Sequence, residues 1–334
     1  MPKTNDYLAG RRVITEDQWR EAAEVLQSSN SVAVCCHISP DGDALGSMIG
    51  LGRFFARQGK KVWMSWGSAE LKTPPQYNFL PGQGDVVTWD QVPSDLEAFV
   101  AIDCGDIGRL ELLKDKFESA AVRLNIDHHL SNPLFGSVNL VDTQCASSSE
   151  IAYELVKRMG GTPTTDEATC FYTGIVTDTG RFQYSNATPK TLRDAAELRE
   201  LGVDHELVAE EIFESASFSY LHVLGIVMSR ARLDNGLVWS WMTPADLGEL
   251  PIEETEHFIE ALKVVKEAGV AALLKQQIEG EWRVSLRSRG EVDVSAVAQS
   301  FGGGGHARAA GFTGKGDLET VCKALIGRIS SSND

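Results

Sequence analysis

The chain has 334 residues, of which 43% are hydrophobic and 23% are charged. This composition is typical of a globular protein, and the length suits two domains or one large one. The formal net charge of −16 argues against a protein that grips long nucleic acid, because such proteins bind the phosphate backbone through basic surface. A small phosphorylated ligand is compatible with this charge, since bound metal ions supply local positive charge.

The cysteines and the hydropathy pattern predict a cytoplasmic protein. The six cysteines include no CxxC pair, so we expect free thiols in a reducing compartment. Residues 1–12 lack the apolar core of a signal peptide. The sequence also has no apolar run long enough to span a bilayer. We therefore expect no membrane attachment.

Short apolar runs alternate with longer amphipathic runs over the first part of the chain. The short runs predict strands at 31–36, 61–66, 98–103 and 121–127. Helical spacing predicts helices at 43–59, 148–159, about 166–177, and from Thr188-Pro189 to about 202. This β-α-β rhythm predicts an α/β fold with a parallel sheet and helices on both faces.

The last third of the chain has a different pattern. Asp234-Asn235-Gly236 is a hairpin signal between two apolar runs. Further elements are predicted as strands at 269–278 and 282–288 and as helices at 294–301 and about 317–329. We therefore predict three segments: an N-terminal domain at 1–202, a helical linker at 203–216 and a smaller α/β domain at 217–334.

Acidic and histidine residues follow three of the predicted strands. The carboxyl ends of parallel strands meet at one edge of an open sheet, where ligands bind. The candidates at this edge are His37, Asp41, Asp43, Asp103 and the triplet Asp127-His128-His129. Asp178, at the end of a predicted helix, is a further candidate.

Six of these residues form a ligand set with two imidazoles and four carboxylates: His37, Asp41, Asp43, Asp103, His128 and Asp178. One metal needs fewer protein ligands, so the set suits two cations about 3.5–4 Å apart that share a carboxylate. Without cations, clustered carboxylates would raise one another's pKa. Mixed histidine and carboxylate ligation favours manganese, with magnesium, cobalt or iron as alternatives.

Each of these signals has a plainer interpretation when taken alone. An isolated Asp-His-His triplet is commonly a surface turn. The pair Asp41 and Asp43, or Asp178 by itself, is commonly a helix cap or terminator. Their joint placement at the ends of predicted elements favours the metal site.

Four segments resemble the motifs of the DHH phosphoesterase family, namely HISPDGDALGS, AIDCGD, IDHH and TDTGRF. The segment SLRSRGEVDVSAVAQSFGGGGHARAAG resembles the signature of the DHH-associated C-terminal domain. Together these resemblances cover nearly the whole chain. The compact pairing is similar to the nano-RNase type of this family, which degrades very short RNAs and removes phosphate from 3′-phosphoadenosine-5′-phosphate (pAp). The active site is then expected in the cleft between the domains.

The resemblance implies a role for each candidate. One metal would be held by His37, Asp41 and Asp103, and the other by Asp43, Asp103, His128 and Asp178, so that Asp103 bridges and is catalytic. His129 would face the scissile phosphate as a catalytic and substrate-binding residue. Arg287, Gly303, Gly304, Gly305 and His306 would bind substrate from the second domain. A homodimer through the first domain is compatible with the resemblance.

The glycine run and two arginines can each be interpreted in two ways. Four consecutive glycines alone commonly form a flexible loop, but Gly302–Gly305 followed by His306 suits a phosphate cradle, because the backbone N–H groups are unobstructed. Arg109 and Arg181 lie close in sequence to Asp103 and Asp178. Each of the two arginines either leans into the site or forms an ordinary surface pair.

Rival functions share parts of this pattern. Family II inorganic pyrophosphatases carry a different, basic C-terminal domain, and a RecJ-like exonuclease would be longer and more basic. A phosphodiesterase for cyclic di-AMP or linear pApA would need the same two domains and stays open. A nucleotide-sensing binding protein without activity is disfavoured, because all six ligand positions are filled.

Overall fold

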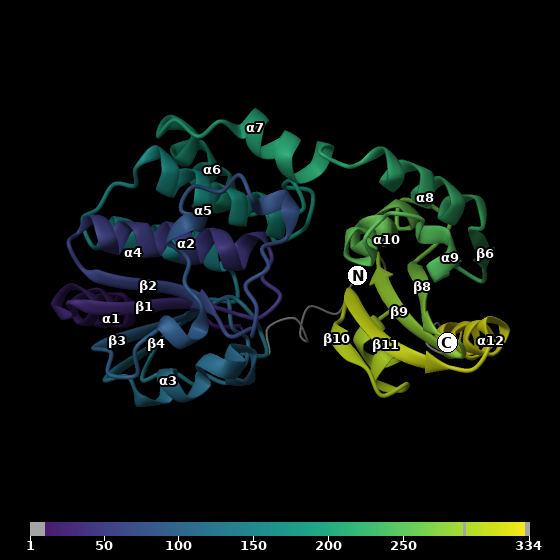
Figure 1. The fold of residues 1–334 in the computed structure, drawn as a ribbon, viewed down its shortest axis with the longest axis horizontal. Helices are drawn as coiled ribbons and strands as arrows, with labels where there is room; N and C mark the ends of the chain where they lie inside the picture. Colours follow the sequence, from purple (N-terminus) through teal and green to yellow (C-terminus); the bar gives the residue numbers. More distant parts are fainter. Residues whose placement is uncertain (1–10, 290–291, 331–334) are drawn as a thin grey trace, which may run out of the picture. The chain divides into compact units, whose positions relative to one another are not determined.

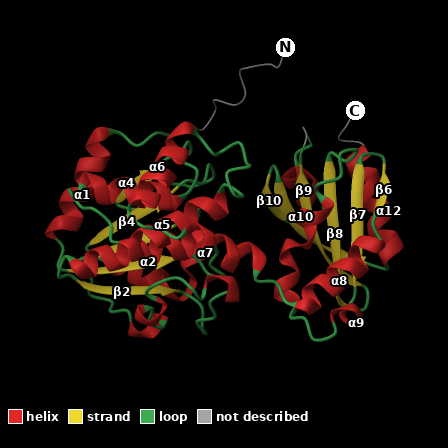
Figure 2. Cartoon of the chain, turned by 90° about the horizontal axis from the view of Figure 1, so that it is seen from above, coloured by secondary structure: helices red, strands yellow, loops and turns green. Residues whose placement is uncertain are grey.

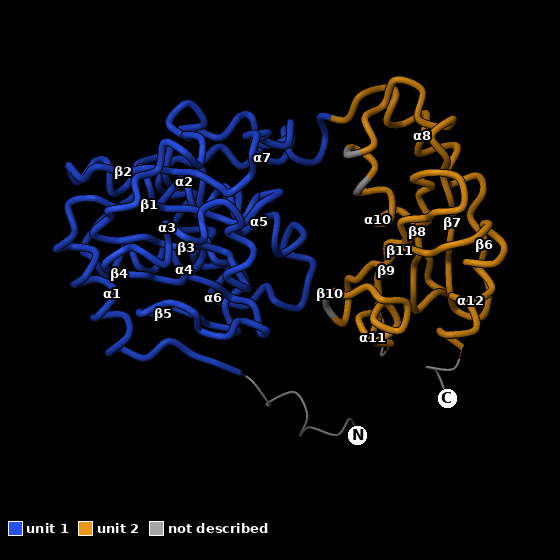
Figure 3. Tube along the Cα trace, turned by 60° about the horizontal axis from the view of Figure 1, so that its bottom comes forward, with its two compact units in different colours: residues 1–215 blue, residues 216–334 orange. Residues whose placement is uncertain are grey.

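A computed structural model describes residues 11–289 and 292–330 of the chain (Figure 1). Contacts divide the chain into two compact units, Met1–Ser215 and Ala216–Asp334 (Figure 3). Each unit has its own sheet and its own hydrophobic core, so each is described by itself. The segment at 203–216 contains α7 (His205–Ala209) and a π-helical turn, Glu210–Glu214. The three-part division with a separate linker remains a prediction.

Unit 1 is built on a five-stranded parallel sheet of order β2-β1-β3-β4-β5. The strands are β1 (Ser31–Cys36), β2 (Lys61–Trp66), β3 (Ala98–Ile102), β4 (Val122–Asp127) and β5 (Val138–Val141). Besides α7, the helices are α1 (Glu16–Ser28), α2 (Gly42–Arg57), α3 (Lys114–Ser119), α4 (Ser148–Arg158), α5 (Thr165–Asp178) and α6 (Pro189–Glu200).

The two faces of this sheet bury alternate residues of each strand. In β1, Val32 and Val34 belong to the larger core, whereas Ala33 and Cys35 belong to a smaller core on the other face. The larger core is closed by α1, α2, α4, α5 and α6, and the smaller one by α3 and the loops around it. Figure 1 shows α2 and α4 on one side of the strands and α3 on the other. The predicted parallel sheet with helices on both faces is confirmed.

Unit 2 is built on a six-stranded mixed sheet of order β10-β11-β9-β8-β7-β6. The strands are β6 (Arg232–Asp234), β7 (Leu237–Met242), β8 (Val270–Ile278), β9 (Glu281–Ser288), β10 (Gly304–His306) and β11 (Ala309–Lys315). The helices are α8 (Phe218–Ser229), α9 (Pro244–Leu247), α10 (Phe258–Leu262), α11 (Val294–Gln299) and α12 (Leu318–Ser330). Figure 2 shows these helices flanking the strands. The predicted α/β fold of the C-terminal part of the chain is thereby confirmed.

Local signals in the sequence correspond closely to the elements of unit 2. The hairpin at Asp234-Asn235-Gly236 joins β6 and β7, and Asn235 adopts the positive φ of 48° that this turn type needs. The strands β8 and β9 pair antiparallel around Gly280, as their alternation predicts. In β7, Leu237 and Trp239 belong to the core under α11 and α12, while Val238 and Met242 belong to the core under α8 and α10.

Several elements were not expected from the sequence. The strand β5 has only four residues, too few for its period to stand out among the polar residues around it. The helices α1, α3, α8, α9 and α10 and the strand β11 were also not predicted. Gly304–His306, expected as a loop or cradle, forms the edge strand β10 paired with β11.

The described residues contain no single helix that is long and apolar enough to cross a membrane. A bent pair, His205–Glu214 with Phe218–Ser229, meets the length and composition criteria only when its two parts are taken together across a 55° bend.

Candidate metal centre

The predicted ligands of unit 1 gather where the strand order reverses. From β1 the chain moves outward to β2 and then returns to β3 on the other side of β1. Such a switch point opens a crevice at the carboxyl ends of the two strands, and ligands bind there in open α/β sheets. His37 follows β1 and Asp103 follows β3 at this point, while His128 follows the neighbouring strand β4.

One donor group is formed by His37, Asp41 and Asp103, whose ligand atoms lie within 4.8 Å of one another. His37 Nε2 lies 3.4 Å from Asp103 Oδ2 and 3.9 Å from Asp41 Oδ2. The other oxygen of Asp41 caps α2 by accepting from the backbone N–H groups of Asp43 and Ala44. The helix cap therefore orients the free oxygen of Asp41 toward His37.

A second donor group is formed by Asp43, His128 and Asp178. His128 Nε2 lies 3.3 Å from Asp178 Oδ2 and 3.6 Å from Asp103 Oδ1. Asp103 therefore presents one oxygen to His37 and the other to His128. This is the arrangement expected of a carboxylate that bridges two cations.

The N-terminus of α4 binds the carboxylate of Asp43. The backbone N–H of Ser148 donates to Asp43 Oδ2 at 2.6 Å, and that of Ser149 donates to Asp43 Oδ1 at 2.8 Å. The Ser148 hydroxyl donates to Asp103 Oδ1 at 2.9 Å. The first N–H groups of a helix lack intrahelical partners and carry partial positive charge, so they suit a carboxylate. These bonds fix Asp43 and Asp103 relative to each other.

Asp103 itself has an uncommon backbone. Its φ is +57°, in the left-handed region that a non-glycine residue seldom occupies. The side chain is only 3% exposed, and the backbone N–H donates to Ile126 O in β4 at 2.9 Å. Such conformations cost about 1–3 kcal/mol and persist where the surrounding structure holds them. Here the adjacent strand holds the residue and turns its carboxylate into the site.

The charges of this cluster fit a bound cation. Burial, together with the charge of Asp103, raises the pKa of Asp43 well above its ordinary value. Burial and the charge of Asp43 raise the pKa of Asp178 in the same way. Carboxyl groups that repel one another in this manner become stable anions when a divalent cation lies between them. Four carboxylates and two imidazoles suit a first-row divalent metal or magnesium.

His129 differs from its neighbour His128. Its Nδ1 donates to Asp127 Oδ1 at 2.7 Å, and Asp127 is fully buried. Asp103, His128 and His129 also form a third group that could hold a metal ion. In it, His129 Nδ1 lies 3.8 Å from Asp103 Oδ1, yet the bond to Asp127 engages that nitrogen. Burial opposes the charged form of His129, but the bond to Asp127 and the charge of Asp103 outweigh burial and raise the pKa of His129 to about 9. The hydrogen bond to Asp127 therefore favours the charged form of His129.

The two arginines with open interpretations have different surroundings. Arg109 Nη2 lies 2.8 Å from His37 Nδ1 and 3.4 Å from Ile38 O, so its guanidinium reaches the predicted ligand set. Arg181 instead lies over the ring of Phe213, with its guanidinium carbon 4.4 Å from the ring centre. Arg109 is therefore the arginine of the two that contacts a predicted metal ligand, His37.

The predicted substrate residues of unit 2 lie on β9 and around β10. Arg287 Nε donates to Glu260 Oε1 at 2.8 Å. A side chain at Gly303 would lie 2.2 Å from Gly311 O, and Gly305 has a φ of +139°, so both positions require glycine. Gly304 has open space where a side chain would be. The side chain of His306 lies outside the described part of the structure.

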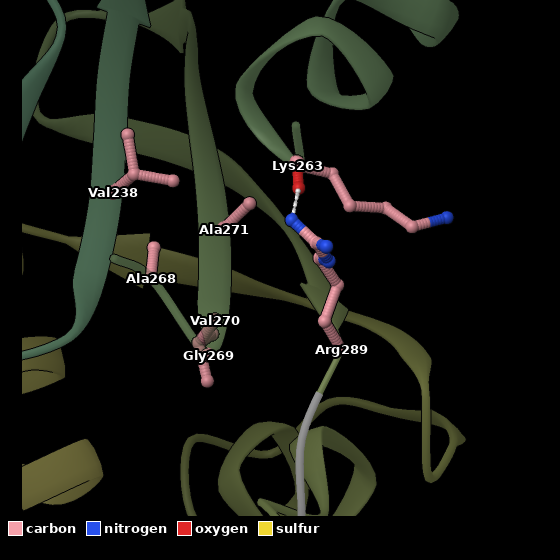
Figure 4. Close-up of a pocket in the computed structure, with 7 residues that line it drawn as sticks. All are labelled: Val238, Lys263, Ala268, Gly269, Val270, Ala271 and Arg289. Carbon is pink, nitrogen blue, oxygen red and sulfur yellow. Dashed lines mark hydrogen bonds between the residues drawn. The ribbon is translucent and has the colours of Figure 1, made fainter. Parts of the chain in front are cut away.

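A shallow pocket in unit 2 is separate from these residues (Figure 4). Its lining comes from β7, β8 and the ends of neighbouring elements: Val238, Lys263, Ala268, Gly269, Val270, Ala271 and Arg289. Arg289 Nη1 donates to the backbone oxygen of Lys263 at 3.1 Å and partly fills it. None of the predicted substrate residues is part of this lining.

Two family models match the chain. The DHH family N-terminal domain matches residues 31–175, and the DHHA1 domain matches residues 251–331. A bifunctional oligoribonuclease and PAP phosphatase NrnA from Thermus thermophilus is 33% identical over 93% of this chain and 93% of its own length. The chain belongs to the DHH family of phosphoesterases. The resemblance recognised in the sequence is confirmed.

Other DHH proteins are similar over nearly the whole chain. A bifunctional oligoribonuclease and PAP phosphatase NrnA from Bacillus subtilis is 28% identical over 91% of this chain and 98% of its own length. The crystal structure of an exopolyphosphatase-related protein from Bacteroides fragilis has a TM-score of 0.89 and 25% identity, and the match covers 96% of this chain and 97% of that one. The fold of both units is therefore one already seen in a solved structure.

Several residues of the DHH site were missed by sequence reasoning. The sequence predicts a helix N-cap at Ser147, Ser148 and Ser149, before an apolar run. Nothing in this segment alone indicates that the N-terminus of the helix contacts Asp43. Asp127 belongs to the recognised triplet, yet its partner Asn132 carried no signal. Both relationships depend on contacts between separate segments.

Proposed function

We propose that this DHH protein hydrolyses phosphate esters of small nucleotides, namely pAp and RNAs of a few nucleotides, with two divalent cations. The proposed ligands are His37, Asp41, Asp43, Asp103, His128 and Asp178, and manganese is the proposed metal. What supports this most directly is that two donor groups lie next to each other at the switch point, with Asp103 directed to both. The names of the relatives support the substrate class.

The residues of unit 1 divide the chemical work. When bound, two cations supply Lewis acidity and lower the pKa of a water molecule to near neutrality. Ser148, at the N-terminus of α4, holds the two donor groups together, because its backbone N–H binds Asp43 and its hydroxyl binds Asp103. His129, oriented by its hydrogen bond to Asp127, is proposed to donate to a phosphate oxygen, where it offsets negative charge that grows during attack on phosphorus.

Unit 2 is proposed to bind the rest of the substrate. Arg287 offers guanidinium N–H groups for a phosphate, and Gly303, Gly304 and Gly305 leave backbone N–H groups accessible. Glu260 holds the Arg287 side chain through Nε, and Nη1 donates to Leu286 O at 3.2 Å, so Nη2 is the proposed phosphate donor. A cleft between the units, a homodimer and a cytoplasmic location are likewise predictions.

A substrate panel tests the proposal. The purified chain is incubated with manganese, magnesium or cobalt and with pAp, pApA, cyclic di-AMP, or RNA of two, four, ten or about 24 nucleotides. We expect phosphate release from pAp and rapid cleavage of the shortest RNAs, with little cleavage of the longest, because a chain of net charge −16 attracts long polyanions poorly. The absence of turnover with every metal and substrate would contradict the proposal.

A further inference from the structure

A buried asparagine lies three residues beyond His129. Asn132 is 1% exposed, although it sits in the loop between β4 and β5. Its backbone N–H donates to His129 O at 3.2 Å. The guanidinium of Arg12 donates to its backbone oxygen. The loop is therefore folded back tightly under His129.

The orientation of the Asn132 amide is determined by its neighbours. Its Oδ1 accepts from the backbone N–H of Leu134 at 2.7 Å. Its Nδ2 faces three oxygen atoms, and only a donor satisfies them. These are Asp127 Oδ2 at 2.6 Å, Asn125 Oδ1 at 2.8 Å and Cys104 O at 3.2 Å. In the flipped orientation, the amide NH₂ would face the N–H of Leu134, and the amide oxygen would face the three oxygen atoms.

Asp127 stands between this amide and His129. One of its oxygens accepts from Asn132 Nδ2, and the other accepts from His129 Nδ1. Asp127 is fully buried, so water cannot easily replace the hydrogen bond from Asn132. Losing that bond would leave a buried carboxylate oxygen without a donor, which is costly. The direction of the carboxylate, and with it the plane of the His129 ring, depends on Asn132.

We infer that Asn132 is a positioning residue for hydrolysis: it holds Asp127 so that His129 presents its imidazole to the substrate phosphate. This inference rests on the proposed function, in which His129 faces the phosphate. Asn132 bonds none of the six proposed metal ligands. Its removal should therefore weaken the chemical step while leaving metal binding in place.

The test uses Asn132→Asp in the full-length chain. The new carboxylate still accepts from Leu134, but it meets Asp127 with an oxygen where a donor is needed. We expect kcat for pAp to fall by about 10- to 100-fold, the usual effect of losing a residue that orients an active-site ligand. KM and the manganese affinity measured by calorimetry should change by less than about threefold. Asn132→Ser, which adds no charge, should show the same pattern and covers the case in which the aspartate variant does not fold.

Asn139 provides a matched control. Its side chain bonds only the backbone of Gly136, accepting from the N–H and donating to the oxygen, at the start of β5. Asn139→Asp makes the same chemical change in the same region without touching Asp127. This variant should retain kcat.

A double-mutant cycle with His129→Gln separates positioning from general support of the fold. If Asn132 acts through His129, Asn132→Asp should have little further effect on kcat in the His129→Gln background. An equal loss in both backgrounds, or a loss of manganese affinity in proportion to kcat, would overturn the inference.

A spectroscopic readout keeps the inference testable if no substrate is turned over, an outcome that would count against the proposed function alone. The Nδ1–H of His129 bound to Asp127 should give a downfield imidazole proton resonance. Asn132→Asp should shift or broaden it, and Asn139→Asp should not. An unchanged resonance in Asn132→Asp would contradict the positioning role.

Discussion

Asp103 is almost fully buried, has a positive φ and directs its two oxygens to two different histidines. The strained backbone is compensated by the bond to β4 and by the Ser148 hydroxyl. Burial alone would raise the pKa of Asp103, but the hydrogen bond from His37 and the charges of His37 and His128 hold it below its usual range. Asp103 therefore stays ionised and ready to bind cations.

Replacing Asp103 or His128 by alanine should abolish activity, with a loss of at least about 100-fold, because even residues that merely support metal ligands cost 10- to 100-fold. Calorimetry should show fewer manganese ions bound per chain. Asp106→Ser is the control: Asp106 lies in the same loop but only caps the turn at Gly108, and serine retains a capping oxygen. Full activity of Asp103→Ala would refute the ligand assignment.

His306→Ala and Arg287→Ala should raise the KM for pAp more than they lower kcat, because both residues are proposed to bind the phosphate away from the reacting bond. Arg283→Ala is the control, since Arg283 lies on the same strand as Arg287 and is exposed. Steady-state kinetics decide the matter. An unchanged KM in His306→Ala would remove that residue from the substrate site.

At the scale of elements, the site depends on two helix ends that meet at Asp43. The N-terminus of α2 carries Asp41 and Asp43, and the N-terminus of α4 binds the Asp43 carboxylate. The last turns of α5 pass close by and end at Asp178. Gly174 in α5 permits this approach, because a Cβ there would lie 1.9 Å from Ser149 Oγ and 2.7 Å from Asp43 Oδ1.

Gly174→Ala should therefore lower the free energy of unfolding of unit 1 by about 1–3 kcal/mol, the usual cost of overpacking. It should also weaken manganese binding, because the added methyl group displaces Asp43. Gly225→Ala in α8 is the contrast, since its added carbon would point into open space, away from other parts of the described structure. There, alanine should stabilise the helix by up to about 1 kcal/mol. Urea unfolding and calorimetry measure both effects, and equal responses of the two variants would contradict the packing argument.

At the scale of the whole molecule, the net negative charge and the proposed metal site have opposite effects on an anionic substrate. The net charge of −16 keeps long polyanions away, whereas bound cations would make the switch point locally positive. The two units have separate cores, so metal binding in unit 1 should stabilise that unit first.

Manganese should therefore raise the unfolding temperature of unit 1 and leave that of unit 2 nearly unchanged. Binding to the folded state alone contributes about 2.7 kcal/mol when the free metal exceeds its Kd by 100-fold. Differential scanning calorimetry with and without chelator checks this. Asp103→Ala should lose most of the response, and an equal shift in that variant would show that the metal acts elsewhere.

The sequence by itself determined the kind of fold and the composition of the candidate site. Strand ends, helix caps and the Asn-Gly hairpin are local signals, and they were sufficient to locate β1, β2, α6 and the β6–β7 hairpin. Acidic and histidine residues at the ends of predicted elements then supplied six candidate ligands, which lie together at one edge of the sheet. Their metal-binding role stays a prediction.

Only the tertiary structure decided how these residues support one another. Asp43 meets Ser148 across 105 positions of sequence, and Asn132 meets Asp127 through a loop that shows no periodic pattern. The stacking of Arg181 on Phe213, the contact of Arg109 with His37 and the pairing of β10 were equally hidden. Such contacts depend on how separate elements pack, and local propensities carry no information about the partner that packing supplies.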